Sequence, residues 1–397
     1  MRSVEEALAA ILDAARLTEA ETLPLERCFG RVPAAFFLTA AVDVPPFDNS
    51  SMDGYALRAA DSPGRLRVAG EVAAGAGTLP EVIPGTAARI MTGAPLPPGA
   101  DAVAPIEVVQ ESESEVEVPA TDPGAYVRRA GHDTRAGESV VLPEEPLTAA
   151  TIGLLASLGF GELAVRRRPR VAILSTGDEL QPPGAPLAAG QIHDANGVAL
   201  AAAITEAGGE PVPLERTPDD PALIEDQVGR GASNADLLVA SGGVSVGRHD
   251  HVRDVIERLG TLDFWRIRVQ PGKPLAFGAV QGVPVLGLPG NPVSALVTFE
   301  LFARPLIRGM LGLPGSGRLM LPVMAAERIG KDEDRRAYLR VRVTREADGL
   351  AARPAGGQQS SQIRPLANAN ALLIVPEGEP AAEAGRTYDA LLLGAIA

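Results

Sequence analysis

Three loops of the sequence combine the residue types that bind phosphate or a divalent cation. A short apolar run leads into STGDE at 175–179, another into SGGVSVG at 241–247, and a third into PGNP at 289–292. Apolar runs bounded by Gly and Pro, with helix-length segments between them, predict βα units of a parallel sheet. In open sheets of this kind, ligands bind beyond the carboxyl ends of the strands. The three loops are therefore expected to face one pocket.

The chemistry of this pocket follows from a contrast between its loops. The 241–247 loop offers hydroxyls and glycine N–H groups ahead of a helix, an arrangement that cradles phosphate. Asp178, Glu179 and Asp250 would place carboxylates beside the phosphate, which repels them unless a cation or a proton intervenes. The set predicts a magnesium-like ion bound through a carboxylate and substrate phosphate, with Glu179 and Asp250 expected either to hold the ion or to position water. The alternative is that Asp178 and Asp250 only cap helices. That alternative would not explain why several carboxylates lie at the same edge of the sheet. The other expected binding residues of the loops are Ser175, Gly177, Ser241, Gly242, Gly243, Ser245, Gly247, Asn291 and Pro292.

Lysine usage singles out one further residue. Of 36 basic residues only Lys273 and Lys331 are lysines, and Lys273 lies in the PGKP segment 271–274 between apolar stretches. A compact ammonium group suits an oxyanion or phosphate. The alternative is chance retention with a salt bridge at the rim of the pocket.

Two apparent motifs are decoys. Residues 243–247 match the G-x-S-x-G nucleophile elbow, but an α/β-hydrolase needs its histidine later in the chain. No histidine follows His251, so a hydrolase is excluded. His249 and His251 are spaced i, i+2 and would point to different sides of a helix. They are expected to be solvated turn residues.

Candidate functional residues also occur upstream of the predicted sheet. Residues 43–56 concentrate acids, an asparagine, serines and aromatics around Asp53, a density more typical of a site than of a surface loop. The turn after residue 90 presents Thr92. Residues 128–133 combine two guanidinium groups with a carboxylate, although an exposed salt-bridged turn would look the same.

Length, composition and charge limit the classes of protein. At 397 residues the chain predicts about two to four domains. The net charge of −14 argues against a nucleic-acid partner, and one cysteine excludes a disulfide framework. No apolar run reaches the roughly 18 residues that a membrane span requires. Glu5 and Glu6 stand where a signal peptide would be basic, so we expect a cytoplasmic protein.

The periodicity predicts a multidomain α/β protein. It has a central doubly wound, mostly parallel sheet, β-rich N-terminal domains and a C-terminal all-β domain. Helices are expected at residues 3–17 (with a Ser3–Glu6 capping box), 148–158, 191–207, from Asp219-Asp220-Pro221, 250–259 and 292–310. An exposed strand is expected within residues 111–118. The expected divisions are an N-terminal helix at 1–20, a linking domain at 21–47 and 135–168, a small β-rich domain at 48–134, the α/β domain at 169–317 and the β domain at 318–397.

Six motifs occur in an order that resembles one family. They are PPFDNSSMDGYA, IMTGAP, STGDEL, SGGVSVG, PGKP and LPGNPVSA, spread from residue 45 to residue 295. Together they resemble the MoeA family of molybdopterin molybdenumtransferases, which is similar to the C-terminal domain of gephyrin. The resemblance covers essentially the whole chain. It implies a cytoplasmic homodimer with shared active sites that uses Mg²⁺ to insert molybdenum from molybdate into adenylylated molybdopterin and releases AMP.

The resemblance also implies roles for particular residues. Asp53, Thr92, Asp133, Glu179 and Asp250 are expected to be catalytic, and the molybdopterin adenylyltransferase is a candidate partner. Two departures from the family pattern are His132, where Glu is frequent, and Gln270, which replaces a lysine found in some members. A non-catalytic carrier or scaffold that only binds the pterin is the alternative function. Expected binding residues beyond the loops above are Arg128, Asp219 or Asp220, Lys273, Arg340 and Ser361.

Overall fold

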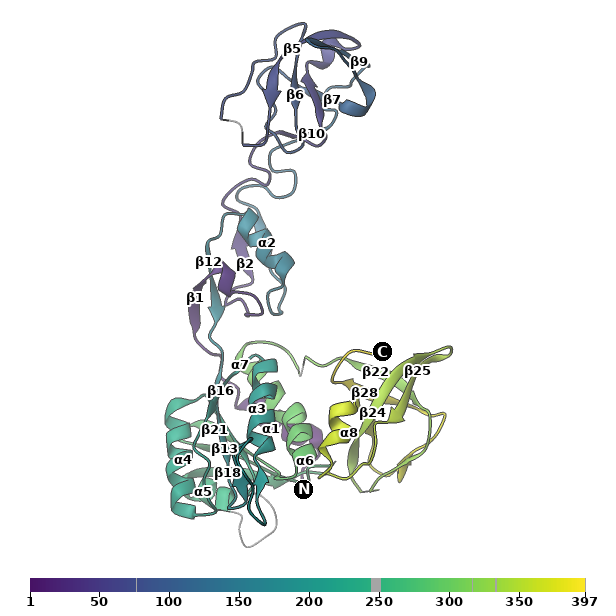
Figure 1. The fold of residues 1–397 in the computed structure, drawn as a ribbon. Coiled ribbons are helices and arrows are strands. Elements are labelled where there is room, and N and C mark those ends of the chain that lie inside the picture. Colours follow the sequence, from purple (N-terminus) through teal and green to yellow (C-terminus); the bar gives the residue numbers. More distant parts are fainter. Residues whose placement is uncertain (76, 244–250, 316, 333, 397) are drawn as a thin grey trace. The chain divides into compact units, whose positions relative to one another are not determined.

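The chain folds into two compact units. The computed structural model describes residues 1–397 apart from 76, 244–250, 316, 333 and 397 and the side chain of Trp265. One unit comprises Met1–Glu21 and Arg166–Ala397, and the other comprises Thr22–Val165. Both are drawn in Figure 1, and each is described here by itself.

The first unit is built on a six-stranded sheet with strand order β16-β13-β17-β21-β20-β18. The first four strands run parallel, while β20 and β18 are antiparallel additions at one edge. This arrangement confirms a central, mostly parallel sheet. The strands are β13 (Arg170–Ser175), β16 (Glu210–Pro213), β17 (Leu237–Ser241), β18 (Gly260–Arg266), β20 (Pro274–Val280) and β21 (Val283–Leu288).

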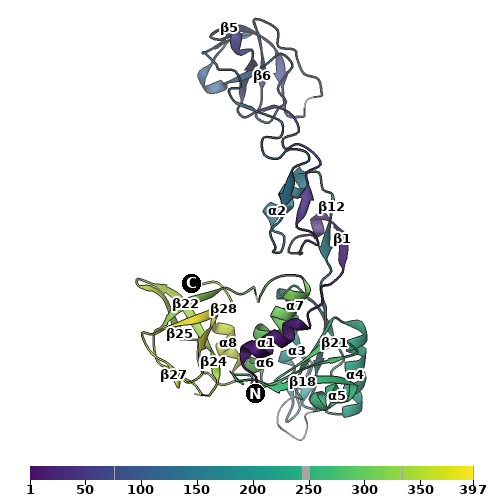
Figure 2. The same cartoon turned by 180° about the vertical axis from the view of Figure 1, so that it is seen from behind.

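Helices cover both faces of this sheet because successive strand side chains point to opposite sides. In β13, Val171 and Ile173 enter a core cluster with Leu200 of α3, whereas Ala172 and Leu174 pack with Ile224 of α4. Figures 1 and 2 show the two helical layers from opposite sides. The helices are α1 (Val4–Asp13), α3 (Ala195–Glu206), α4 (Pro221–Asn234), α5 (His251–Leu259), α6 (Pro292–Thr298) and α7 (Arg304–Met310), with a π-helical turn at Phe299–Ala303.

The predicted helix starts are confirmed where capping residues marked them. Ser3 and Glu6 form the capping box of α1, and Asp220 caps α4 with Pro221 in its first turn. The predicted ends and lengths are less accurate. The first helix ends at Asp13 rather than Leu17, and the third begins at Ala195, after the two-residue strand β15 (Ile192–His193), rather than at Gln191. The predicted helix 292–310 contains the π-helical turn.

The C-terminal part of the same unit is a β-barrel. Its strands follow the order β19-β24-β25-β22-β28-β26, and an additional β24–β26 pairing closes the sheet on itself. The all-β expectation is right apart from one short helix, α8 (Ile363–Asn368). The strands are β19 (Val269–Gln270), β22 (Met320–Ala325), β24 (Arg336–Glu346), β25 (Gly349–Pro354), β26 (Ala371–Val375) and β28 (Thr387–Leu392), and β23 (Ile329–Gly330) pairs β27 (Ala381–Ala382).

The second unit is rich in β-structure, as expected. Its main sheet has the order β7-β4-β6-β5-β9-β8. The segment expected to be one exposed strand is a hairpin of β8 and β9, and Val116 and Val118 of β9 are buried. The predicted helix 148–158 is α2 (Ala149–Ser157), capped by Thr148, but it buries only one side. The strands of the main sheet are β4 (Gly54–Leu57), β5 (Gly64–Val72), β6 (Thr86–Ile90), β7 (Ala102–Pro105), β8 (Gln110–Glu111) and β9 (Glu115–Val118).

Smaller strand pairs complete the described chain. They are β1 (Ala20–Pro24) with β12 (Glu162–Arg166), β2 (Phe37–Thr39) with β11 (Ser139–Val141), β3 (Asn49–Ser50) with β10 (Val127–Arg128), and β14 (Leu180–Gln181) with β15. Within the described residues, no helix has the length and apolar character needed to cross a bilayer.

Candidate functional site

The three predicted loops converge on one pocket of about 660 Å³ in the first unit. They follow β13, β17 and β21, which are neighbours in the sheet and parallel, so their carboxyl ends lie side by side. The lining residues are Thr176, Gly177, Glu179, Leu180, Ile192, His193, Asp194, Ala195, Asn196, Asp219, Ser241, Gly242, Gly243, Pro274, Pro289, Gly290, Asn291, Pro292 and Ser361.

The first loop brings a carboxylate to the pocket. Gly177 has φ +147°, and a Cβ at this position would lie 2.6 Å from Glu179 Oε2. The Glu179 side chain therefore folds back against a glycine that leaves room for it. Asp178 is not a lining residue of the pocket, and its Oδ1 accepts a hydrogen bond from the Asp219 N–H at 3.1 Å. Asp178 thus fixes the position of Asp219, which does line it.

The second loop approaches the first so closely that only glycine fits. Gly242 has φ +99° and Gly243 has φ +64°. A Cβ on Gly242 would lie 2.9 Å from the Thr176 carbonyl oxygen, and one on Gly243 would lie 2.8 Å from Val252 Cγ2. The Gly242 N–H donates to the Leu288 carbonyl oxygen at 3.2 Å, and the bare turn allows an anion to approach the Gly243 backbone without side-chain obstruction. The remaining predicted residues of this loop, Ser245, Gly247 and Asp250, lie outside the described residues.

Asn196 was missed by the sequence analysis and connects two of the loops. Its Nδ2 donates to Ser241 Oγ at 2.8 Å and to the Gly290 carbonyl oxygen at 2.7 Å. Asp194 caps the helix that carries it. An asparagine in the first turn of a helix at the carboxyl edge of the sheet was the available signal. Ser175, by contrast, is buried and is not a lining residue.

The third loop joins the pocket to the C-terminal barrel. Asn291 Nδ2 donates to Ser360 Oγ at 3.0 Å, and the Val293 N–H donates to the Ser360 carbonyl oxygen at 3.2 Å. These contacts bring Ser361, the next residue, to the pocket wall. The barrel therefore contributes directly to the site.

Arg340 lies behind this wall rather than in it. Its side chain is 1% exposed, and its Nη2 donates to the carbonyl oxygens of Gly357 at 3.3 Å and Gln359 at 3.4 Å. Burial lowers the pKa of the Arg340 guanidinium to about 10. Arg340 thus supports the segment that presents Ser361.

Two other predicted binding residues also stand outside the lining. Lys273 is exposed, next to the lining residue Pro274. Its loop is held against α6, since a Cβ on Gly272 would lie 2.4 Å from Thr298 Cγ2. Gln270, the departure from the family pattern, accepts a hydrogen bond from the Asp332 N–H through its Oε1 at 2.9 Å. Asp220 accepts from the N–H groups of Ala222 and Leu223 as the cap of α4.

In the second unit, Asp53 and Thr92 lie in direct contact. Asp53 Oδ1 accepts from both Thr92 N and Thr92 Oγ1, each at 2.7 Å. Both residues are exposed. The two hydrogen bonds, that of the hydroxyl first, lower the pKa of the Asp53 carboxyl. The pair therefore presents a stable carboxylate.

The predicted 128–133 turn is attached to the same motif. Asp48 accepts from Arg129 Nη1 at 2.6 Å and from the Ala130 N–H at 2.8 Å, and these contacts lower the pKa of the Asp48 carboxyl. The ion pair joins the turn to residues 45–56 rather than closing the turn on itself. The other predicted residues of the turn, Arg128, His132 and Asp133, are exposed.

The donor set of the pocket suits a magnesium ion that is completed by substrate. Within residues 1–243 and 251–396, apart from the gaps given above, no three acidic, cysteine or histidine side chains form a metal cluster. Mg²⁺ commonly uses one or two carboxylates together with substrate phosphates, so a full protein cage is not required. Glu179 and Asp219 line the same pocket as the Gly242–Gly243 turn, which fits this type of site.

The fold and the pocket together define an α/β protein with a candidate anion-binding pocket, an attached β-barrel and a β-rich N-terminal unit. Residues 2–159 match the family "MoeA N-terminal region (domain I and II)", residues 172–309 match "Probable molybdopterin binding domain", and residues 322–393 match "MoeA C-terminal region (domain IV)".

Known proteins give the same result over nearly the full length. Molybdopterin molybdenumtransferase 2 of Mycobacterium tuberculosis is 39% identical over 391 residues, which cover 95% of this chain and 96% of that protein. Molybdopterin molybdenumtransferase of Haemophilus influenzae is 41% identical over 301 residues, 74% of each protein. The solved molybdopterin biosynthesis MoeA protein of Pyrococcus horikoshii has a TM-score of 0.83, is 34% identical and covers 99% of both chains. The chain belongs to the MoeA family of molybdopterin molybdenumtransferases.

Proposed function

We propose that this chain is a transferase of molybdenum cofactor biosynthesis that inserts molybdenum from molybdate into adenylylated molybdopterin and releases AMP. The observation that carries the proposal is the pocket at the carboxyl ends of β13, β17 and β21, where a glycine turn and carboxylates lie together. The relatives named above are molybdopterin molybdenumtransferases, and this chain aligns with most of the length of each. No feature of the described residues favours a carrier or scaffold over an enzyme.

Some pocket residues are proposed to bind the substrate phosphate, and others are proposed to assist cleavage of the phosphoanhydride bond. The Gly243 N–H and the Ser241 hydroxyl hold phosphate oxygens of the adenylylated substrate, while the Gly242 N–H donates to the Leu288 carbonyl oxygen. Glu179 orients the water that adds to the phosphorus of the pterin phosphate and takes its proton, while the anhydride P–O bond breaks and AMP leaves with the bridging oxygen. Asp53 and Thr92 are proposed to face the dithiolene and molybdate, and Asp133 is proposed to assist them.

Magnesium is proposed to be held by Glu179 together with substrate phosphate. When bound, it neutralises charge that otherwise sets the carboxylates against the phosphoanhydride. Asp250, the second expected ligand, lies outside the described residues. We propose the cytoplasm as the place of this reaction.

A turnover assay separates the enzyme from a carrier. Purified chain is mixed with adenylylated molybdopterin, molybdate and Mg²⁺, and AMP release is measured together with protein-bound molybdenum. The proposal predicts AMP release that requires the chain and is catalytic in it. Tight binding of the pterin without AMP release would support the carrier instead.

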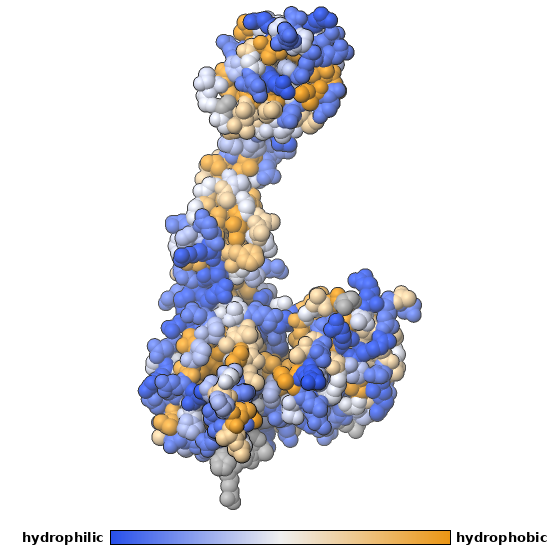
Figure 3. All heavy atoms as spheres, in the orientation of Figure 1, coloured by the Kyte–Doolittle hydropathy of each residue, from blue (hydrophilic) through white to orange (hydrophobic). Residues whose placement is uncertain are grey.

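We also propose that the chain acts as a homodimer with shared active sites. Apolar side chains gather on the part of the second unit that carries β2 and α2 (Figure 3). There Phe37 and Val141 face each other across β2 and β11, yet remain 72% and 63% exposed. Exposed apolar patches commonly mark protein interfaces.

Mixed dimers test the sharing of sites. Inactive Asp53→Ala and Glu179→Ala chains are unfolded and refolded together, so that about half of the dimers are mixed. If each site uses these residues from different subunits, roughly a quarter of sites recover activity. If a preparation shown to contain mixed dimers has no activity, the proposal of shared sites is wrong.

A further inference from the structure

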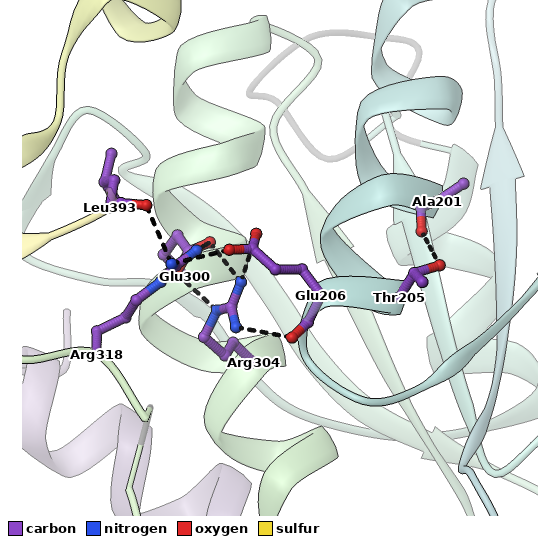
Figure 4. A network of polar contacts seen from close by, with 7 residues as sticks. All are labelled: Ala201, Thr205, Glu206, Glu300, Arg304, Arg318 and Leu393. Carbon is purple, nitrogen blue, oxygen red and sulfur yellow. Dashed lines mark hydrogen bonds and ion pairs between the residues drawn. The ribbon is translucent and has the colours of Figure 1, made fainter. Parts of the chain in front are cut away.

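A buried charge network lies away from the pocket, in the middle of the long helix that begins at it (Figure 4). Glu300 belongs to the π-helical turn and is 8% exposed. Arg304 contacts both of its oxygens, with Nε to Oε2 at 2.7 Å and Nη2 to Oε1 at 3.1 Å. Arg318 also contacts both, with Nε to Oε2 at 2.9 Å and Nη2 to Oε1 at 3.0 Å.

Glu206 at the end of α3 completes this network. Its Oε2 pairs with Arg304 Nη2 at 3.0 Å and its Oε1 with Arg318 Nη1 at 2.9 Å. Two carboxylates thus match two guanidinium groups, and each guanidinium keeps a partner on both acids. Bidentate pairing of this kind fixes orientation as well as charge.

Arg318 extends the network into the barrel. It lies in the connection between α7 and β22, and its Nη1 donates to the Leu393 carbonyl oxygen at 3.2 Å. Leu393 is itself bound within the barrel, where its N–H donates to the Asn370 carbonyl oxygen at 2.8 Å. One side chain therefore contacts α3, the π-helical turn and the barrel at once.

Two sets of polar contacts join the barrel to the long helix, in addition to the apolar core that Leu372 and Leu391 of the barrel share with that helix. The first is at the pocket, where Ser360 contacts Asn291 and Val293. The second is the Arg318 contact with Glu300, further along the same helix. Because these polar contacts are directional and lie at two points of one helix, they restrict the orientation of the barrel more than apolar packing alone does.

We propose that Arg318, acting with Glu300, is a positioning residue that holds the barrel so that Ser361 is presented at the substrate pocket. Arg318 is not a lining residue of the pocket, and we propose that it acts through the barrel. The network would thus affect the reaction as well as stabilise the helix. The expected effect on the reaction rests on the proposed function.

Amide hydrogen exchange tests the positioning without using activity. The variant Arg318→Met keeps the apolar stem and leaves Glu300 paired with Arg304. It is expected to speed exchange in peptides covering residues 291–298 and 356–362, with no change in β13 or β17. The matched control is Arg328→Met, which removes an exposed ion pair to Glu383 within the barrel and should leave those peptides unchanged.

A double-mutant cycle with Ser361 tests the catalytic consequence. Arg318→Met is expected to lower kcat/KM roughly 2- to 30-fold, the range of energetic coupling between distant sites. If it acts through Ser361, the double variant Arg318→Met/Ser361→Ala is no slower than the slower single variant. Arg318→Lys, which keeps the charge but not the bidentate contact, should recover part of the activity, and it replaces Arg318→Met in both tests if that variant does not fold.

Two results would overturn the positioning role. One is unchanged exchange at residues 291–298 and 356–362 in folded Arg318→Met. The other is additive loss of activity in the cycle, which is the behaviour of a residue that only stabilises the fold. If the parent chain releases no AMP, the proposed function fails, and the exchange experiment still decides the positioning.

Discussion

The carboxylate of Asp53 accepts both the backbone N–H and the hydroxyl of Thr92 through one oxygen, Oδ1. The residues come from β-rich segments 39 positions apart in sequence. Both hydrogen bonds favour the charged form of the acid, and they leave Oδ2 without a contact to Thr92. The structure therefore explains why the MDGY and MTGAP motifs occur together in this chain.

Removing the Thr92 hydroxyl should raise the pKa of Asp53 toward its ordinary value, because the hydroxyl is the first cause of the lowered pKa. Thr92→Val removes that donor and keeps the N–H, while Thr92→Ser keeps both. The lowered pKa means that the interaction is complete above the ordinary aspartate pKa and is lost as pH falls through the lowered value. NMR titration of the Asp53 carboxyl measures the shift. An equal pKa in Thr92→Val and the parent would contradict this account.

Loss of the Asn196 side chain should weaken ligand binding, because it loosens the two loops that the side chain connects. Asn196→Ala removes two hydrogen bonds that hold the second and third loops, each worth about 1 kcal/mol. We expect the Kd for the adenylylated pterin to rise about 10- to 30-fold, measured by calorimetry. Asn234→Ala, which removes a single exposed bond on α4, is the control and should not change the Kd. Equal Kd values for both variants would remove Asn196 from the site.

Asp220 distinguishes a helix cap from a binding residue. Its Oδ1 accepts two N–H groups of α4, so Asp220→Ala should lower the free energy of unfolding by about 1 kcal/mol. Asp220→Ser preserves the cap and should restore stability in denaturant unfolding. If Asp220 also binds substrate, as predicted from the sequence, the serine variant keeps its stability but loses affinity. Normal affinity of that variant would leave capping as its function.

The sequence predicted well what short-range rules determine. Ser3, Asp220 and Pro221 marked helix starts because their side chains bond to neighbouring backbone groups. The alternation of apolar runs and helices gave the parallel order of strands, and hence the shared edge of the three loops.

Long-range contacts were not predictable from the same rules. Asn196 spans 45 and 94 positions to reach its two partners, and no local pattern encodes such a pairing. The same applies to Arg340, a predicted binding residue whose contacts with the carbonyl oxygens of Gly357 and Gln359 no local pattern encodes. The π-helical turn and the hairpin within residues 110–118 depend on tertiary packing, which overrides local periodicity.

The central claim is that the pocket beyond β13, β17 and β21 is where AMP is released, and Glu179 tests it most directly. Glu179→Gln keeps the shape of the side chain and removes the charge that orients water and holds magnesium. The control is Glu257→Gln, at an exposed position of α5 where the acid pairs with Arg253.

Single-turnover AMP release and the Kd for the adenylylated pterin are measured for the parent and both variants. The account predicts that Glu179→Gln slows AMP release by about 10²- to 10⁴-fold while the Kd changes little, as expected for an interaction made in the transition state. Glu257→Gln should match the parent. AMP release at the parental rate from folded Glu179→Gln would contradict the account.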